Sequence, residues 1–293
     1  MQIGIQLPEV ERYVPWTEYR TMAETAEAAG YSSLWLGDHF LYRRKDEDLG
    51  PWECWSMLAA IAAVTDRVLL GPLVSPTGFR NPAVLAKMAA TVDEIGGGRL
   101  ILGLGSGWNE REFDAYGVPY DRRVSRFEEE FAIITDLIRT GRSSFSGEFF
   151  GQDDNVLVPP ARQDLPIMIG STGPRMLAIT AGEMDWWNEW FANFGNRPDK
   201  LAKLVDQLDA ALIQAGREPA DVVRSAALFV ELPGYGERTQ KKRITPISGD
   251  TSEITDRLLE FSDLVDHVQL VVDPITIESI ETLAPVVQAI HNA

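Results

Sequence analysis

RLILGLGSGWNEREFDAYG, residues 99–117, joins a mainly apolar run to a glycine cluster and the start of a helix. Residues 99–104 are enclosed by glycines, as is typical of a buried parallel strand. The glycines let a ligand approach the backbone, and a helix beginning near Asn109 offers free N–H groups. A dinucleotide fingerprint does not fit, because its last glycine would fall on Trp108. A ligand-binding turn and an ordinary strand-to-helix turn both remain open.

The chain on either side of this stretch repeats the same strand-then-helix order. Eight such alternations predict an α/β fold, a (β/α)8 TIM barrel forming one domain over residues 1–293, with an open doubly wound sheet as the alternative. Residues 145–160 are expected to form a short antiparallel excursion before the fifth strand, and residues 234–249 a mobile loop. The expected strands are residues 3–7, 33–37, 68–73, 99–104, 165–169, 184–187, 223–231 and 265–271.

Composition limits the possible partners. The net charge of −17 would repel nucleic-acid phosphates, so no nucleic-acid partner is expected. No apolar run is long enough to cross a bilayer, and the chain opens on a strand pattern rather than a signal sequence, so we expect a cytoplasmic protein without a membrane partner. Three histidines without metal-ligand spacing predict no metal site. The single cysteine, Cys54, lies in a helix pattern and is expected to be a buried thiol.

The catalytic face of a TIM barrel is built from the loops at the carboxyl ends of its strands. This rule selects candidate residues by position alone. They are Glu9, Tyr13, Asp38, His39, residues 74–77, residues 105–110, residues 170–173, Trp187, Asn188 and some part of residues 234–249.

The loop Gly170-Ser171-Thr172-Gly173 is the most specific of these candidates. It comes directly before a helix that starts with Pro174, and Arg175 follows in the first turn. Backbone donors, two hydroxyls and an arginine beside a helix start suit a phosphate group. The alternative is ordinary helix capping by Ser171 or Thr172.

His39 and Asp38 stand at the end of the second strand. A histidine there can give or take a proton near neutral pH, although it can also be structural. Trp187 and Trp108 suit the two sides of a flat ring or, equally, a core. Because few titratable groups lie on this face, we expect a bound phosphate-bearing cofactor to supply the chemistry, with a small molecule as substrate.

Several ordered segments resemble the bacterial-luciferase-like superfamily of flavin and deazaflavin oxidoreductases, most of all its members that use coenzyme F420. The resemblance covers essentially the whole chain. It is carried by IGIQLP (3–8), LWLGDHF (34–40), LLGPLVSPTGFRNPAVLAK (69–87), the stretch at 99–117, IMIGSTGPRML (167–177) and DWWN (185–188).

The resemblance implies a TIM barrel with the cofactor ring at the strand carboxyl ends. It places Asp38 and His39 near the ring and a non-proline cis peptide at Leu73–Val74. It further implies ring or ribityl contacts from Ser106 and Gly107. Phosphate contacts would come from Gly170, Ser171, Thr172 and Gly173, and Trp187 is included among the cofactor-binding residues.

One departure bears on the substrate. In the sugar-phosphate dehydrogenases of this superfamily, a glutamate proton donor directly follows the glycine turn. Here Trp108 takes that place and Glu110 stands two residues later. Sugar phosphates are therefore disfavoured, and Glu110 joins His39 and Asp38 as a catalytic candidate.

Charge raises a second question, since F420 carries an acidic tail and this chain is strongly acidic. A local groove is expected around Arg80, Lys87, Arg111 and Arg175. We expect a homodimer that transfers a hydride between F420 and a small organic substrate, with His39 handling the proton. An FMN-dependent monooxygenase and a non-catalytic flavin-binding barrel are the alternatives.

Overall fold

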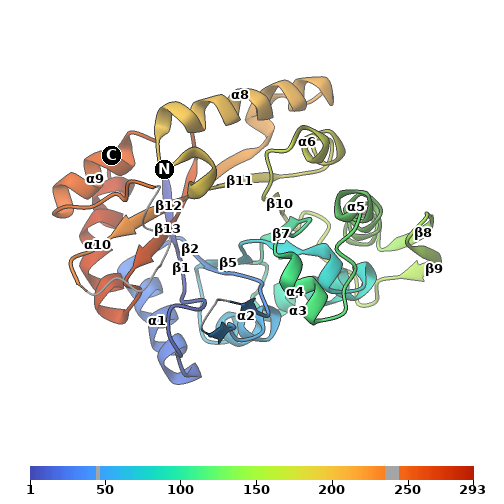
Figure 1. Cartoon of the computed structure of the whole chain (residues 1–293), viewed down its shortest axis with the longest axis horizontal. Helices are drawn as coiled ribbons and strands as arrows, with labels where there is room; N and C mark the ends of the chain where they lie inside the picture. The colour runs from blue at the N-terminus through green and yellow to red at the C-terminus, as the bar shows by residue number, and fades with distance from the viewer. Residues whose placement is uncertain (44–46, 235–243) are drawn as a thin grey trace.

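A parallel β-barrel surrounded by helices forms the body of the protein (Figure 1). The computed structural model describes residues 1–43, 47–234 and 244–293. The strand order is β5-β2-β1-β13-β12-β11-β10-β7-β6. Hydrogen bonds from Leu70 N to Arg99 O (2.9 Å) and from Ile101 N to Leu70 O (2.8 Å) link the third barrel position to the fourth. The TIM-barrel prediction is confirmed, and the open-sheet alternative is wrong.

The strands follow the predicted apolar runs with shifts of a few residues. β5 and β6 are two halves of one barrel position, because β5 pairs with β2 whereas β6 pairs with β7. The barrel strands are β1 (Gln2–Gln6), β2 (Ser33–Leu36), β5 (Leu69–Pro72), β6 (Ser75–Pro76), β7 (Leu102–Gly105), β10 (Ile167–Ile169), β11 (Trp186–Trp190), β12 (Val223–Glu231) and β13 (His267–Asp273).

Local signals explain where the helices begin and end. Gly30 follows α1 with a φ of 92°, a conformation that glycine adopts readily. Asn81 caps α3 by accepting a hydrogen bond from Ala83 N (3.0 Å). The helices are α1 (Trp16–Ala29), α2 (Cys54–Ala62), α3 (Pro82–Ile95), α4 (Glu110–Ala115), α5 (Arg123–Thr140), α6 (Pro174–Thr180), α7 (Phe191–Phe194), α8 (Pro198–Gln214), α9 (Thr251–Leu259) and α10 (Ile277–His291), with 3-10 turns η1 (Thr77–Phe79) and η2 (Pro219–Asp221).

Two antiparallel pairs stand outside the barrel. The excursion predicted before the fifth strand is present as β8 (Arg142–Ser146) and β9 (Gly151–Val156). A smaller pair, β3 (Tyr42–Arg43) and β4 (Asp48–Leu49), lies in a segment expected to be only a surface loop. The predicted mobile loop at 234–249 falls largely outside the described residues.

The amino-terminal half of the barrel interior is filled, which leaves the other end for a site. Trp35, Ile101 and Met168 form a buried cluster there. Beside them, His267 Nε2 lies 2.9 Å from Ser33 Oγ. Burial lowers the pKa of His267 to about 3, so this histidine is neutral at ordinary pH. Within the described ranges, no helix combines the length and apolarity needed to cross a bilayer.

Candidate active site

His39 lies between two carboxylates at the carboxyl-terminal mouth of the barrel. Its Nδ1 is 2.9 Å from Glu112 Oε2, and its Nε2 is 3.9 Å from Glu9 Oε1. Burial alone lowers the pKa of His39, but the hydrogen bond to Glu112 and the charges of Glu9, Glu112 and Asp38 outweigh it and raise that pKa above 6.5. His39 is therefore poised to carry a proton near neutral pH.

Glu112, on α4, is the carboxylate that fixes the segment containing His39. It is 1% exposed, and it accepts hydrogen bonds from Phe40 N and from Leu41 N (3.1 Å). Glu110, the sequence candidate on the same helix, is exposed. Residues two apart on a helix do not share a face. The apolar Phe113 beside Glu112 was the sequence clue that this side of the helix faces inward, and Phe113 is indeed fully buried.

Glu9 reaches the mouth from the loop after β1. Its Oε1 accepts a hydrogen bond from Tyr42 Oη (2.6 Å), and Gln6 Nε2 lies 3.4 Å from its Oε2. Gly37 makes room for it, because a Cβ added there would come 2.7 Å from the Glu9 carboxyl carbon. The positional rule had selected Glu9, but nothing in the sequence paired it with His39.

Asp38 turns away from the mouth into the core. Its carboxylate receives two hydrogen bonds from Arg80, at 2.6 and 3.0 Å, and one from the Ser75 hydroxyl. Arg80 also donates to Glu53 Oε1 (2.6 Å), the residue that caps α2. Asp38 thus anchors the backbone next to His39, while its closeness to a cofactor ring stays a prediction. Arg80 is occupied by these carboxylates rather than free to bind an acidic tail.

The peptide bond Leu73–Val74 is cis, as predicted. It lies between β5 and β6, and both residues are half-buried at the mouth. The Val74 methyl groups fill the space that side chains would need at three glycines, two on β7 and one after β10. A Cβ at Gly103, Gly105 or Gly170 would come 3.1, 2.8 or 2.9 Å from them, respectively.

The turn after β7 presents Ser106 and Gly107 half-buried at the mouth. Gly107 has a φ of 77°, and a Cβ there would lie 2.6 Å from Phe113 Cζ. The Gly107 carbonyl accepts a hydrogen bond from Arg123 Nε (3.1 Å). This arginine was missed by the sequence reasoning, because it stands at the start of a different helix.

Residues 170–173 lie between β10 and α6 and remain partly accessible. The first residue of α6 is Pro174 as expected, but the helix cap is Gly173 and involves no side-chain hydrogen bond. Neither Ser171 nor Thr172 is thus the cap residue, although Ser171 Oγ accepts a hydrogen bond from Gly173 N at 3.4 Å. Trp187 Nε1 donates to Ser171 O (3.0 Å), and its ring is fully buried.

The two tryptophans that were expected to flank a flat ring or to lie in the core differ in their positions. Trp187 supports the loop from behind, among the core side chains, instead of facing the mouth. Trp108 is 62% exposed, and its ring centroid is 5.6 Å from that of His39. Of the pair, Trp108 is placed to contact a molecule bound at the mouth.

The basic residues near the mouth differ from those expected. Lys87 donates to Val158 O, on the side of α3. Arg175 donates to Ser125 Oγ at 3.0 Å, which brings it beside the start of α5. Arg122, Arg123 and Arg126 also stand at that start, but Arg122 is paired with Glu148, Arg126 with Asp121 and Arg175 with Glu128. Arg111 contacts Arg43 O at 3.4 Å.

The mouth suits a flat heterocycle that bears a phosphate. Leu73 and Val74 offer an apolar surface, and the loop at 170–173 presents partly accessible backbone. Beneath them, Gln6 Oε1 and Gln269 Nε2 are buried, and no hydrogen-bond partner for either lies within the described residues. Cys54 is buried, as expected, and across the described ranges no cluster of metal-ligating side chains is found.

Comparisons with known proteins agree with the barrel fold. A family model described as luciferase-like monooxygenase matches residues 1–232. A phthiodiolone/phenolphthiodiolone dimycocerosates ketoreductase of Mycobacterium sp. (strain JLS) is 32% identical over 248 residues, 72% of this chain and 62% of the relative. The chain thus spans about three fifths of the curated relatives it matches first.

Two solved structures share the fold. An F420-dependent secondary alcohol dehydrogenase in complex with an F420-acetone adduct aligns with a TM-score of 0.83 at 18% identity, covering 99% of this chain and 98% of that one. The monooxygenase RslO1 from Streptomyces bottropensis aligns with a TM-score of 0.79 at 20% identity, covering both chains completely (100% each).

Replacing Glu112 tests the electrostatics of His39. Glu112→Gln keeps an acceptor for Phe40 N and Leu41 N but removes the negative charge, so the pKa of His39 falls toward or below 6.5. Proton NMR titration of the imidazole measures the shift, since only three histidines contribute signals. Glu110→Gln, an exposed change on the same helix, leaves that pKa unchanged. An unaltered His39 pKa in Glu112→Gln contradicts the assignment.

Proposed function

This chain belongs to the luciferase-like monooxygenase family, and from that premise we propose that it is an oxidoreductase that moves a hydride between coenzyme F420 and a small organic substrate. The observation that carries the proposal is the His39 imidazole held between Glu112 and Glu9 at the barrel mouth. When bound, the deazaflavin ring supplies the hydride chemistry. What remains for the protein is to orient both molecules and to manage one proton.

His39 manages the proton through Nε2. Its Nδ1 is engaged by Glu112, so in the neutral ring Nδ1 carries the hydrogen and Nε2 is the free base. In carbonyl reduction, Nε2–H gives its proton to the substrate oxygen, and in alcohol oxidation Nε2 takes it back. Glu9 and Glu112 favour the protonated ring between these steps.

The cofactor would be held by residues that the structure leaves accessible. Leu73 and Val74 would back its ring, Ser106 and Gly107 would contact the ring or ribityl chain, and the loop at 170–173 would take the phosphate. Arg175, in the first turn after that loop, supports F420 over FMN, because the acidic tail of F420 favours a cationic neighbour and the exposed pair of Arg175 with Glu128 is weak enough to exchange. The structural likeness to the F420-dependent secondary alcohol dehydrogenase supports the same choice.

An FMN-dependent monooxygenase is the second candidate. The family description and the likeness to RslO1 favour it. Arg123, bonded to the Gly107 carbonyl, and Arg175 argue for the first candidate, since FMN has no long acidic tail for these two cations to meet.

His39→Ala tests the proton-handling role. Turnover falls about 10²–10⁴-fold, the usual contribution of a general acid–base. F420 affinity, measured by fluorescence titration, changes much less. In the parent enzyme, carbonyl reduction slows as pH rises through the raised pKa of His39, because the proton donor is lost, and the variant lacks this dependence. Turnover within a few-fold of the parent means that His39 is structural.

Gly173→Asp tests the phosphate loop. The new carboxylate repels a phosphate bound there, so F420 affinity falls at least tenfold, as calorimetry measures. Gly173→Ala is the matched control: Gly173 has a φ of −61°, and its added Cβ meets only Ser171 Oγ, at 3.9 Å. That variant binds F420 like the parent. Equal affinity in the aspartate variant places the phosphate elsewhere.

A further inference from the structure

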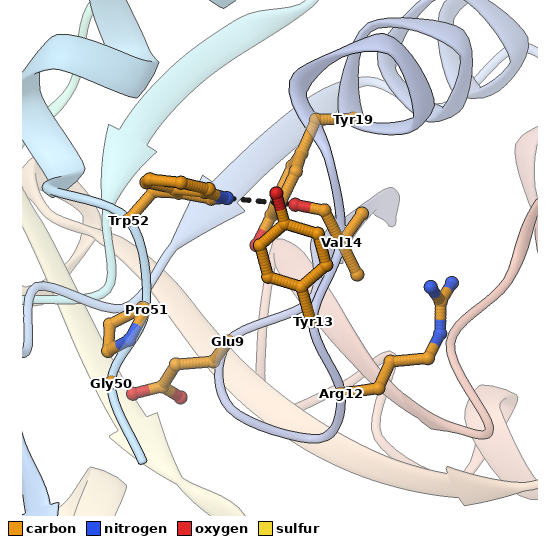
Figure 2. Close-up of a pocket in the computed structure, with 8 residues that line it drawn as sticks. All are labelled: Glu9, Arg12, Tyr13, Val14, Tyr19, Gly50, Pro51 and Trp52. Atoms are coloured by element: carbon orange, nitrogen blue, oxygen red, sulfur yellow. Dashed lines mark hydrogen bonds between the residues drawn. The ribbon is translucent and has the colours of Figure 1, made fainter.

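A pocket of about 170 Å³ opens beside the mouth, between the loop after β1 and the segment that leads into α2 (Figure 2). Figure 2 shows the Tyr13 ring in the middle of it, with Trp52 on one side and Arg12 on the other. The lining residues are Glu9, Arg12, Tyr13, Val14, Tyr19, Gly50, Pro51 and Trp52.

Two aromatic rings of the pocket are unusually accessible. Tyr13 is 76% exposed and Trp52 48% exposed, and their ring centroids are 5.9 Å apart at 62°. Adjoining exposed aromatic side chains are typical of a surface that contacts a ligand. Neither ring is needed to fill the core.

The pocket walls are fixed in place by hydrogen bonds. Trp52 Nε1 donates to Val14 O at 2.8 Å, as the dashed line in Figure 2 marks, and the Tyr19 hydroxyl donates to Pro8 O. At the outer end, Arg12 Nη1 donates to Glu18 Oε2 (3.1 Å). A ligand therefore meets a largely formed surface, which reduces the entropy lost on binding.

Glu9 connects this pocket to the reaction centre. It lines the pocket, and its Oε1 is 3.9 Å from His39 Nε2 and 2.6 Å from Tyr42 Oη. The pocket of Tyr13 and Trp52 therefore reaches the carboxylate that lies beside the imidazole. The carboxylate of Glu9, together with the net charge of −17, disfavours an anionic molecule at this place.

We propose that this pocket holds the ring of an uncharged aromatic ketone or secondary alcohol, whose oxygen faces His39. The proposal rests on the proposed hydride-transfer function for the orientation of that oxygen. The size agrees with one six-membered ring, because a cavity of about 150 Å³ accepts benzene. Tyr13 and Trp52 are then specificity-determining residues, and the ring adds affinity that a substrate such as acetone lacks.

The experiment uses acetophenone as the probe and the protein saturated with oxidised F420, so that the ketone binds without reacting. Calorimetry gives its dissociation constant. Tyr13→Ala weakens binding about tenfold because it removes a stacking surface, whereas Tyr13→Phe, which keeps the ring, stays within about twofold. Ile213→Ala, which removes an exposed apolar side chain from α8, is the matched control and leaves binding unchanged.

A kinetic comparison measures the selectivity between acetophenone and acetone. With reduced F420, Tyr13→Ala lowers the ratio of kcat/KM for acetophenone to kcat/KM for acetone about tenfold, mainly through the KM for acetophenone. Unaltered acetophenone affinity and an unaltered ratio in this variant overturn the pocket proposal.

The two proposals fail separately. Acetone reduction together with acetophenone binding that is insensitive to Tyr13→Ala overturns the pocket and leaves the hydride-transfer function standing. If the protein does not bind F420, acetophenone is titrated into the protein alone. Binding of acetophenone that depends on Tyr13, with no reduction of either ketone, supports the pocket as a ring site and overturns the hydride-transfer function.

Discussion

The buried carboxylate of Glu112 joins the turn after β2 to the helix after β7, and the arrangement at the barrel mouth depends on it. It accepts hydrogen bonds from the His39 ring and from the backbone of Phe40 and Leu41. A buried carboxylate is stable only when such donors surround it. The same contacts that satisfy Glu112 therefore fix the tautomer of His39, its orientation and its affinity for a proton.

The carboxylates around His39 have different tasks. Asp38 is neutralised by Arg80 in a buried ion pair, and loss of one partner from such a pair costs about 3–5 kcal/mol. Glu9 stays at the surface of the mouth, bound by Tyr42 and facing both His39 and the pocket of Tyr13 and Trp52. Asp38 thus anchors the loop, Glu112 orients the histidine, and Glu9 faces the pocket that we propose for the substrate.

The fold was predictable because apolar runs, glycines and prolines recur locally along the chain. The cis peptide bond at Leu73–Val74 was predicted from the family resemblance instead. The contacts between residues of the site were harder to predict from the sequence. Glu110 was chosen for its distance from the glycine turn, whereas helix geometry buries Glu112 instead. Trp187 was predicted to flank a bound ring, whereas the alternation of side chains along β11 directs it into the core. Pairings such as Arg80 with Asp38 join residues far apart in sequence, and no local pattern reveals them.

Calorimetric titration with F420 and with FMN, at low and at high ionic strength, tests the central claim most directly. Arg175 directly follows the proposed phosphate loop and reaches Ser125 on α5, so the acidic tail of F420 adds an electrostatic contribution that salt screens. We predict that F420 binds more tightly than FMN at low salt and that the difference narrows at high salt. Tighter binding of FMN at both ionic strengths would contradict an F420-dependent function.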